Sequence, residues 1–159
     1  MVKKLVADDS ITLQKLRLQL VKENPIVFGE TFESESEFML QDYKNWIKKR
    51  SVKDSGIFVI FLDGKAIGMC EVRPDKENDV GYFGSLGILR EYQGKGFGSM
   101  LMDFRLEWAK KNTNFKKIKT IITKNNKRML VIAQKQGFKI VGEGNYKSEP
   151  EYYLERELG

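Results

Sequence analysis

A glycine-rich loop between a strand and a helix constrains the fold of this chain more than any other stretch. Apolar residues predict a strand from Val80 to Leu89, and mostly helical spacing follows from Ser99 to about Lys111. Between them the sequence reads Gln-Gly-Lys-Gly-Phe-Gly, from Gln93 to Gly98. Three glycines at alternate positions are costly in conformational entropy, but they let the backbone approach a ligand closely. Because the N-terminus of the next helix adds about half a positive charge, the stretch predicts a phosphate cradle made of backbone N–H groups.

Two common phosphate-binding loops do not fit this sequence. A dinucleotide-binding loop needs a third glycine where Ser99 stands. A P-loop needs its first glycine where Leu89 stands and a Ser or Thr where Gly96 stands. The three strands expected between residues 56 and 89 form a meander, which also argues against a doubly wound parallel sheet.

Composition narrows the chemistry. The 159 residues fit one domain, 1–159, and histidine is absent. The single cysteine, Cys70, excludes an internal disulfide, and no metal site is expected. Any proton transfer must therefore use carboxylates, Tyr, Lys, Cys or water. The N-terminus lacks a signal-peptide pattern and no apolar run approaches the roughly 20 residues of a membrane span, so we expect a cytoplasmic protein with no membrane partner.

The net charge of +6 raises the question of nucleic acid. The basic clusters, such as Lys48-Lys49-Arg50 and Lys116-Lys117, are most simply solvated faces, and the chain shows no RNA-type aromatic motif and no helix-turn-helix pattern. A polyanionic cofactor suits the sign of this charge equally well. We therefore expect no nucleic-acid partner.

Hydrophobic periodicity predicts seven strands and four helices in the order β-α-α-β-β-β-α-β-α-β-β. Strands are expected at residues 3–7, 56–62, 65–73, 80–89, 117–123, 138–141 and 152–157, and helices at 10–23, 34–50, 99–111 and 126–136. Residues 24–33 and 142–150 read as loops, and Ser34 with Glu37 reads as a capping box that opens the second helix. This order predicts an α/β fold, with helices flanking a central mixed, mostly antiparallel sheet.

Three patterns in the chain resemble the GNAT superfamily of N-acetyltransferases. The glycine loop matches the family's pyrophosphate loop, [QR]-x-x-G-x-[GA], through Gln93, Gly96 and Gly98. The helix after the loop is the second pattern. The third is Asn126-x-x-Met129-x-x-x-Ala133-x-x-x-Gly137-Phe138, which looks like the second family motif. The order of elements is similar over essentially the whole chain, so the resemblance implies a GNAT-like fold with acetyl-CoA as cosubstrate.

The resemblance also implies which residues hold the cosubstrate. Backbone groups of the strand would pair with the pantetheine arm as an extra strand does, and backbone N–H groups of the loop would take the pyrophosphate. Asn126 would bond to the cosubstrate or simply cap its helix. The implied binding residues are Leu86, Gly87, Ile88, Gln93, Gly94, Lys95, Gly96, Phe97, Gly98, Ser99 and Asn126.

The catalytic groups are less defined by sequence. Many family members carry Tyr at the position of Ala133, where it can protonate the leaving thiolate. Ala133 has no group that can do this, so solvent or Tyr146 would have to protonate the thiolate. Deprotonating an alkylammonium at pH 7 costs about 4–5 kcal/mol, so a general base that takes this proton would assist the reaction. Glu71 is the first candidate, with a solvent-facing strand carboxylate as the alternative. Tyr82 is the second, with a core aromatic as the alternative.

We therefore expect an acetyl-CoA-dependent N-acetyltransferase that acts on a primary amine. A small molecule, such as a polyamine, an amino acid derivative or an amino sugar, is favoured over a protein N-terminus or lysine. Four glutamates between residues 30 and 37 could attract such a cation, although capping explains them too. The absence of the family's Tyr at Ala133 also motivates a non-catalytic acyl-CoA sensor. A homodimer stays open.

Overall fold

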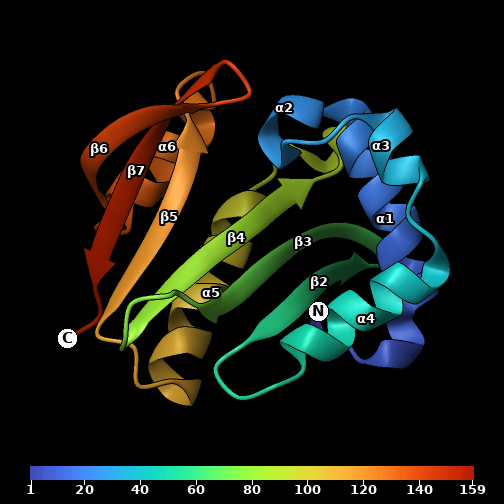
Figure 1. Cartoon of the computed structure of the whole chain (residues 1–159), viewed down its shortest axis with the longest axis horizontal. Coiled ribbons are helices and arrows are strands. Elements are labelled where there is room, and N and C mark those ends of the chain that lie inside the picture. The colour runs from blue at the N-terminus through green and yellow to red at the C-terminus, as the bar shows by residue number, and fades with distance from the viewer.

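A seven-stranded mixed sheet in the order β1-β2-β3-β4-β5-β7-β6 forms the centre of the molecule (Figure 1). The computed structural model describes residues 1–159, apart from the side chains of Ile26 and Val27. The strands are β1 (Val2–Lys4), β2 (Gly56–Leu62), β3 (Lys65–Pro74), β4 (Val80–Ile88), β5 (Lys117–Thr123), β6 (Lys139–Tyr146) and β7 (Glu149–Glu157). Only the β4–β5 pair is parallel, which confirms the predicted sheet.

Helices cover both faces of the sheet. They are α1 (Ser10–Glu23), α2 (Pro25–Phe28), α3 (Phe32–Ser36), α4 (Leu40–Arg50), α5 (Phe97–Asn112) and α6 (Lys127–Lys135). The four longer ones correspond to the four that periodicity predicts. In the described part of the chain, no helix combines the length and apolarity that crossing a membrane requires.

Two apolar cores lie on opposite faces of the sheet, and strand β2 supplies both. Phe58 and Ile60 pack on the face of α5 and α6, whereas Ile57 and Val59 pack on the face of α1 and α4. Successive side chains of a strand point to opposite faces, so an unbroken apolar run is buried on both. Residues 56–60 are accordingly buried, whereas Leu62 at the end of the strand is exposed.

The sheet splits between β4 and β5, and this split positions the site. The two strands pair only from Val80 with Lys117 to Phe83 with Thr120, and then diverge, as Figure 1 shows. In β4 the register against β3 shifts, with Cys70 opposite Leu86 but Glu71 opposite Gly84. Ser85 is therefore the extra residue of a β-bulge, a feature that bends a strand and re-aims its neighbours.

The segment before α4 differs from the sequence prediction. Residues 24–33, expected as a loop, contain α2 and the start of α3. The cap of α3 is Thr31, whose hydroxyl accepts from the Ser34 N–H at 3.1 Å, so the predicted capping box at Ser34 was wrong. The predicted single helix is interrupted because Asp42 accepts from the Met39 N–H at 2.7 Å and starts α4 afresh.

The C-terminal hairpin is also longer than predicted. Residues 142–150 were expected as a loop, but β6 continues to Tyr146 and β7 begins at Glu149. The turn consists of Lys147 and Ser148, with φ values of 48° and 68°. Two left-handed residues suit the twist of a two-residue hairpin, yet Lys-Ser lacks the Asn-Gly signature that makes such turns readable from sequence.

Candidate active site

A cleft of about 840 Å³ opens where the sheet splits. The end of β4, the glycine loop with the start of α5, and one side of α6 form its walls, and α1 and α2 border it. Every predicted cosubstrate-binding residue lines this cleft except Lys95 and Phe97, which lie in the loop and at the start of α5 but outside the lining. The fold thus brings Asn126, which is distant in the sequence, next to the glycine loop and to Leu86 and Ile88 at the end of β4.

The glycine loop presents unpaired amides to the cleft. Gly94 and Gly96 have φ values of +75° and +89°, the left-handed region that favours glycine. Gly96 is the N-cap of α5 and provides no side chain to satisfy the first amides of the helix. Within the described residues, none of the N–H groups from Gly94 to Ser99 has an acceptor. This arrangement fits a bound anion.

Cationic side chains lie beside the loop. A Cβ atom added to Gly94 would lie 4.0 Å from Nη1 of Arg128, and Lys127 and Arg90 also line the cleft. Lys124, just before α6, lies outside the cleft and pairs with Glu143 at 2.8 Å. The positive charge at the mouth of the cleft thus comes from the first turn of α6 and from the segment before the loop.

Strand β4 offers a free backbone edge. The Leu89 N–H donates to the Ile67 carbonyl on β3 at 2.8 Å. Because backbone groups alternate along an antiparallel strand, Gly87 also faces β3, whereas Leu86 and Ile88 face the split. The Gln93 side chain donates to the Ile88 carbonyl at 2.9 Å, so Gln93 ties the loop to the strand. The Ile88 N–H is left as a donor toward the cleft.

Asn126 connects α6 to the cleft. Its Oδ1 accepts from the Met129 N–H at 3.3 Å, which makes it the N-cap, and its Nδ2 has no acceptor among the described residues. The capping role of Asn126 is therefore observed, and its Nδ2 group lies at the cleft wall, where the predicted bond to the cosubstrate stays a prediction.

The two roles of Asn126 can be separated. Asn126→Asp keeps an oxygen for the cap but removes the Nδ2 donor, whereas Asn126→Ala removes both. We expect Asn126→Ala to lower the unfolding free energy by about 1 kcal/mol, and Asn126→Asp to leave it near that of the wild type. Urea unfolding measures the cap, and calorimetric titration with coenzyme A measures the donor. Equal stability of the two variants would contradict the capping role.

Glu71 lies away from both cavities of the split. It is 5% exposed and faces α4, where Trp46 Nε1 donates to it at 3.0 Å. Arg50 and Arg73 approach the other oxygen at 3.5 Å and 3.3 Å. These three contacts occupy the carboxylate, so the geometry favours a structural role over proton transfer.

Arg105 supports the bulge, and sequence reasoning missed it. Its Nη1 donates to the carbonyls of Gly84 at 2.7 Å and Glu71 at 3.3 Å, one on each strand of the bulged pair. Burial lowers the pKa of Arg105 to about 10. Its spacing in the sequence could have indicated its burial, because Arg105 lies four residues after Leu101 and four before Ala109, on the buried face of α5.

A second cavity of about 310 Å³ continues from the cleft. The two share Phe28, Leu86, Asn126 and Met129 in their walls. The second is further lined by polar side chains from three strands, β4, β5 and β7: Tyr82, Ser85, Thr120, Thr123, Glu149 and Glu151. The other predicted catalytic residue, Tyr82, thus lies here, and burial raises the pKa of its phenol.

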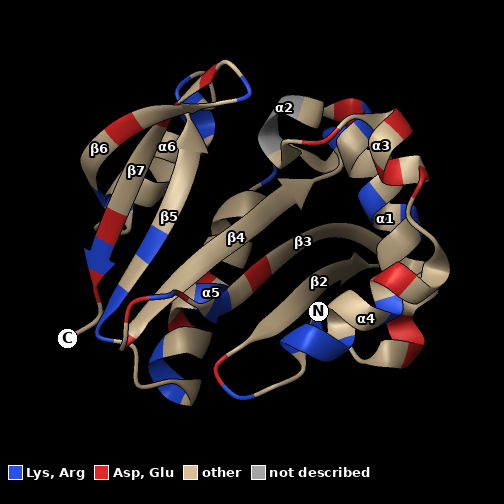
Figure 2. Ribbon diagram, viewed as in Figure 1, with Lys and Arg blue, Asp and Glu red and all other residues tan. Residues whose placement is uncertain are grey.

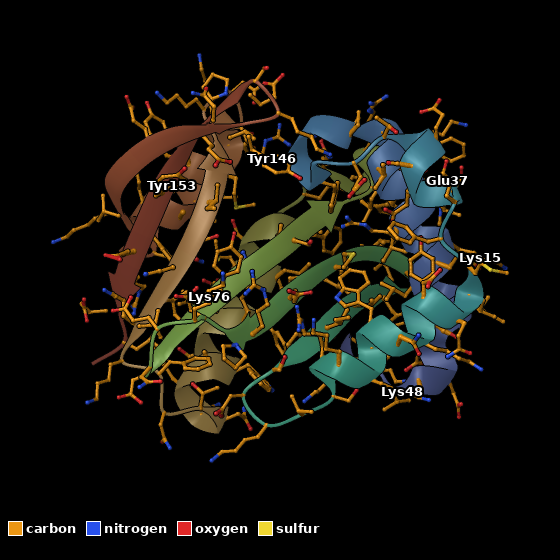
Figure 3. The ribbon with its side chains drawn as sticks, in the orientation of Figure 1. Lys15, Glu37, Lys48, Lys76, Tyr146 and Tyr153 are labelled. Atoms are coloured by element: carbon orange, nitrogen blue, oxygen red, sulfur yellow. The ribbon has the colours of Figure 1, made fainter. Side chains whose placement is uncertain are left out.

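The β6–β7 hairpin borders this second cavity on one side. Tyr146 lies at the lip between the β6–β7 turn and α2 (Figure 3), and its ring contacts Gly29. Lys147 Nζ donates to the Gly29 carbonyl at 2.8 Å. The cavity is therefore bounded by the split sheet on one side and by these contacts on the other.

The glutamates between residues 30 and 37 give α3 an acidic surface (Figure 2). Glu35, however, is 3% exposed and accepts from Arg17 at 2.9 Å and from the Tyr43 hydroxyl at 3.1 Å. Glu30 accepts from the Ser34 hydroxyl at 2.8 Å. Both line a third, separate cavity of about 240 Å³ rather than the one that continues the cleft.

Cys70 is fully buried beneath β4, and burial raises the pKa of its thiol to about 11. At pH 8 the thiol therefore stays protonated and shielded, and we expect no reaction with a disulfide reagent such as Ellman's reagent until the chain unfolds. The colour yield with and without guanidinium checks this. Stoichiometric reaction of the folded protein would contradict the burial.

Comparison with known proteins agrees with this architecture. The family model described as "Acetyltransferase (GNAT) family" matches residues 19–138. A search of curated proteins finds no match. The chain is similar to a GNAT-family acetyltransferase from Streptococcus pneumoniae, with a TM-score of 0.89 and 20% identity over 100% of this chain and 99% of that one.

Two further solved structures share the fold. A ribosomal-protein-alanine N-acetyltransferase from Brucella melitensis superposes with a TM-score of 0.82 and 16% identity, covering 99% of each chain. A variant of the spermidine N-acetyltransferase from Vibrio cholerae superposes with a TM-score of 0.74 and 18% identity, covering 99% of this chain and 95% of that one. At these identities the structures establish the fold alone, whereas the family model matches most of the sequence. The chain belongs to the GNAT family of acetyltransferases and is an enzyme that uses acetyl-CoA for N-acetylation.

Proposed function

We propose that this enzyme acetylates a primary amine of a small molecule. The observation that carries the proposal is the size and position of the cavity that continues the cosubstrate cleft. At about 310 Å³, and bordered by the Tyr146 ring where the hairpin turn meets the segment after α2, it suits a compact acceptor better than a folded protein surface.

The cleft fits acetyl-CoA on its own residues. The amides from Gly94 to Ser99, with Arg128 beside them, would hold the pyrophosphate. The free edge at Leu86 and Ile88 would pair with the pantetheine arm. Bound acetyl-CoA supplies an activated thioester, and the Ile88 N–H is the donor placed to polarise its carbonyl.

Ala133 bears on the alternative, a non-catalytic acyl-CoA sensor. It is fully buried against α5 and the sheet, so no side chain from this position reaches the cleft. A thiolate with a pKa near 8.5 needs little help to leave at neutral pH, and solvent can protonate it. The missing tyrosine therefore does not by itself argue against catalysis.

An amine panel tests the proposal. We expect free thiol to be released from acetyl-CoA with at least one small aliphatic amine, and not with peptides that present a free N-terminus or lysine. Release with peptides alone would place the acceptor among proteins. Acetyl-CoA binding without release for any amine or peptide would favour the sensor.

A further inference from the structure

Glu151 is a buried carboxylate without a partner. It lies on β7, is 9% exposed and lines the 310 Å³ cavity. Among the described residues, no side chain or backbone N–H donates to it, and no cation lies within ion-pair distance. Its oxygens are not among the fully buried atoms without a partner, so the carboxylate of this largely buried residue is reached from the cavity. A carboxylate that the protein leaves unpaired at a cavity wall is available to a ligand that carries donors.

Thr123 provides a second, independent observation. It lies directly opposite Glu151 in the β5–β7 pair, so the two side chains share one face, about 5 Å apart at Cβ. The Thr123 hydroxyl oxygen is buried and has no hydrogen-bond partner, and Thr123 lines the same cavity. Two adjacent oxygens without donors point to a ligand that carries several N–H groups.

The charges around this pair favour a cation. Glu149, from the start of β7, adds a second carboxylate to the wall. Tyr82 from β4 and Tyr146 from β6 add phenols. The one cationic side chain in the described lining, Arg105, uses Nη1 on the carbonyls beneath the bulge. The carboxylates thus outnumber the cation facing them.

We propose that Glu151 binds the ammonium group of the acceptor and takes its proton before acetyl transfer. This inference rests on the proposed function, because it requires acetyl-CoA in the adjoining cleft. One N–H bond of the ammonium breaks and the proton moves to the Glu151 carboxylate. The neutral nitrogen then forms the C–N bond, the thioester C–S bond breaks and the thiolate leaves. The nitrogen gives up a second proton to solvent to become the amide, and the thiolate takes a proton from solvent. Glu151 returns its proton to water after the product departs.

The binding step is tested with a matched pair of probes on protein saturated with coenzyme A. These are 1,4-diaminobutane and 1,4-butanediol, which share length but not charge. In calorimetric titration we expect the diamine to bind at least about tenfold more tightly than the diol, and Glu151→Gln to remove that preference. Glu143→Gln is the control, because that carboxylate lies on β6 outside the cavity and pairs with Lys124. No preference for the diamine in the wild type, or an unchanged preference in Glu151→Gln, would overturn the proposal.

Proton removal is tested separately by the choice of nucleophile. For any amine that the wild type acetylates, Glu151→Gln should lower kcat/KM about 10²-fold or more. With hydroxylamine, which is already neutral at pH 7, the same substitution should lower kcat/KM less than about threefold. With alkylamines the decrease in kcat/KM should become smaller as the pH rises toward the pKa of the amine. An equal loss for both nucleophiles would show that Glu151 only shapes the cavity.

The two proposals fail in different ways. Coenzyme A affinity, measured first, should be the same in the wild type, Glu151→Gln and Glu143→Gln. If none of them bound it, the proposed function would fail. If all bound it and released thiol with amines at equal rates, only the role of Glu151 would be rejected.

Discussion

Gly96→Val is expected to weaken acetyl-CoA binding by about 100-fold. Gly96 sits at φ +89° and caps α5, where a β-branched residue is strained whatever the space around it. Relief of that strain rotates the peptide planes on either side, so the amides between Gly94 and Ser99 no longer converge. A 100-fold loss corresponds to about 2.8 kcal/mol, comparable to losing two charge-assisted hydrogen bonds. Calorimetric titration with acetyl-CoA measures it.

Gly64→Val is the matched control. Gly64 has a similar φ of +79° in the turn between β2 and β3, with open space around it, and it lies outside the cleft. Its substitution should cost stability through the same strain and leave acetyl-CoA affinity unchanged. If both variants lost affinity alike, general destabilisation would explain the result and the loop would lose its assigned role.

Arg17→Met is expected to lower the free energy of unfolding by about 3–5 kcal/mol, because it leaves a buried carboxylate without its cation. Arg17 is 7% exposed and its Nε donates to Glu35 at 2.9 Å, while its guanidinium lies 4.6 Å from the Phe28 ring. It also reaches the Ser85 hydroxyl at 3.4 Å. The residue thus ties α3 and α2 to the bulge, and urea denaturation measures the cost of losing it.

An exposed pair provides the reference for this measurement. Lys65 and Glu91 lie 2.8 Å apart with side chains that are 52% and 59% exposed. Lys65→Met should leave the free energy of unfolding close to that of the wild type, because solvent screens the pair. The double variant Arg17→Met with Glu35→Leu should recover part of the stability, since no charge is then left buried. A loss below about 1 kcal/mol for Arg17→Met alone would show that Glu35 is not buried as described.

The parts of the fold that sequence predicts are those with a strong period or a glycine signature. The apolar run at residues 56–62, the Asp63-Gly64 hairpin and the loop from Gln93 to Gly98 are of this kind. The break between α3 and α4 is not, because it depends on two local caps: Thr31 and Ser34 hydrogen-bond to each other, and Asp42 accepts from the Met39 N–H.

Candidate catalytic carboxylates were harder to place, for a geometric reason. Glu71 and Glu151 both lie on strands and read alike in sequence. Which one faces a cavity depends on the divergence of β4 from β5 and on which cations reach each face. Arg50 and Arg73 approach Glu71, whereas Glu151 lies opposite Thr123 in the β5–β7 pair, and neither neighbourhood is local in the chain.

Amide chemical shifts recorded while coenzyme A is added test the central claim most directly. The largest changes are expected for the N–H groups from Gly94 to Ser99 and for Ile88, with smaller changes at Asn126 and Arg128. Saturation of binding with those signals unmoved, and shifts gathered on another surface, would contradict the site at the split of the sheet.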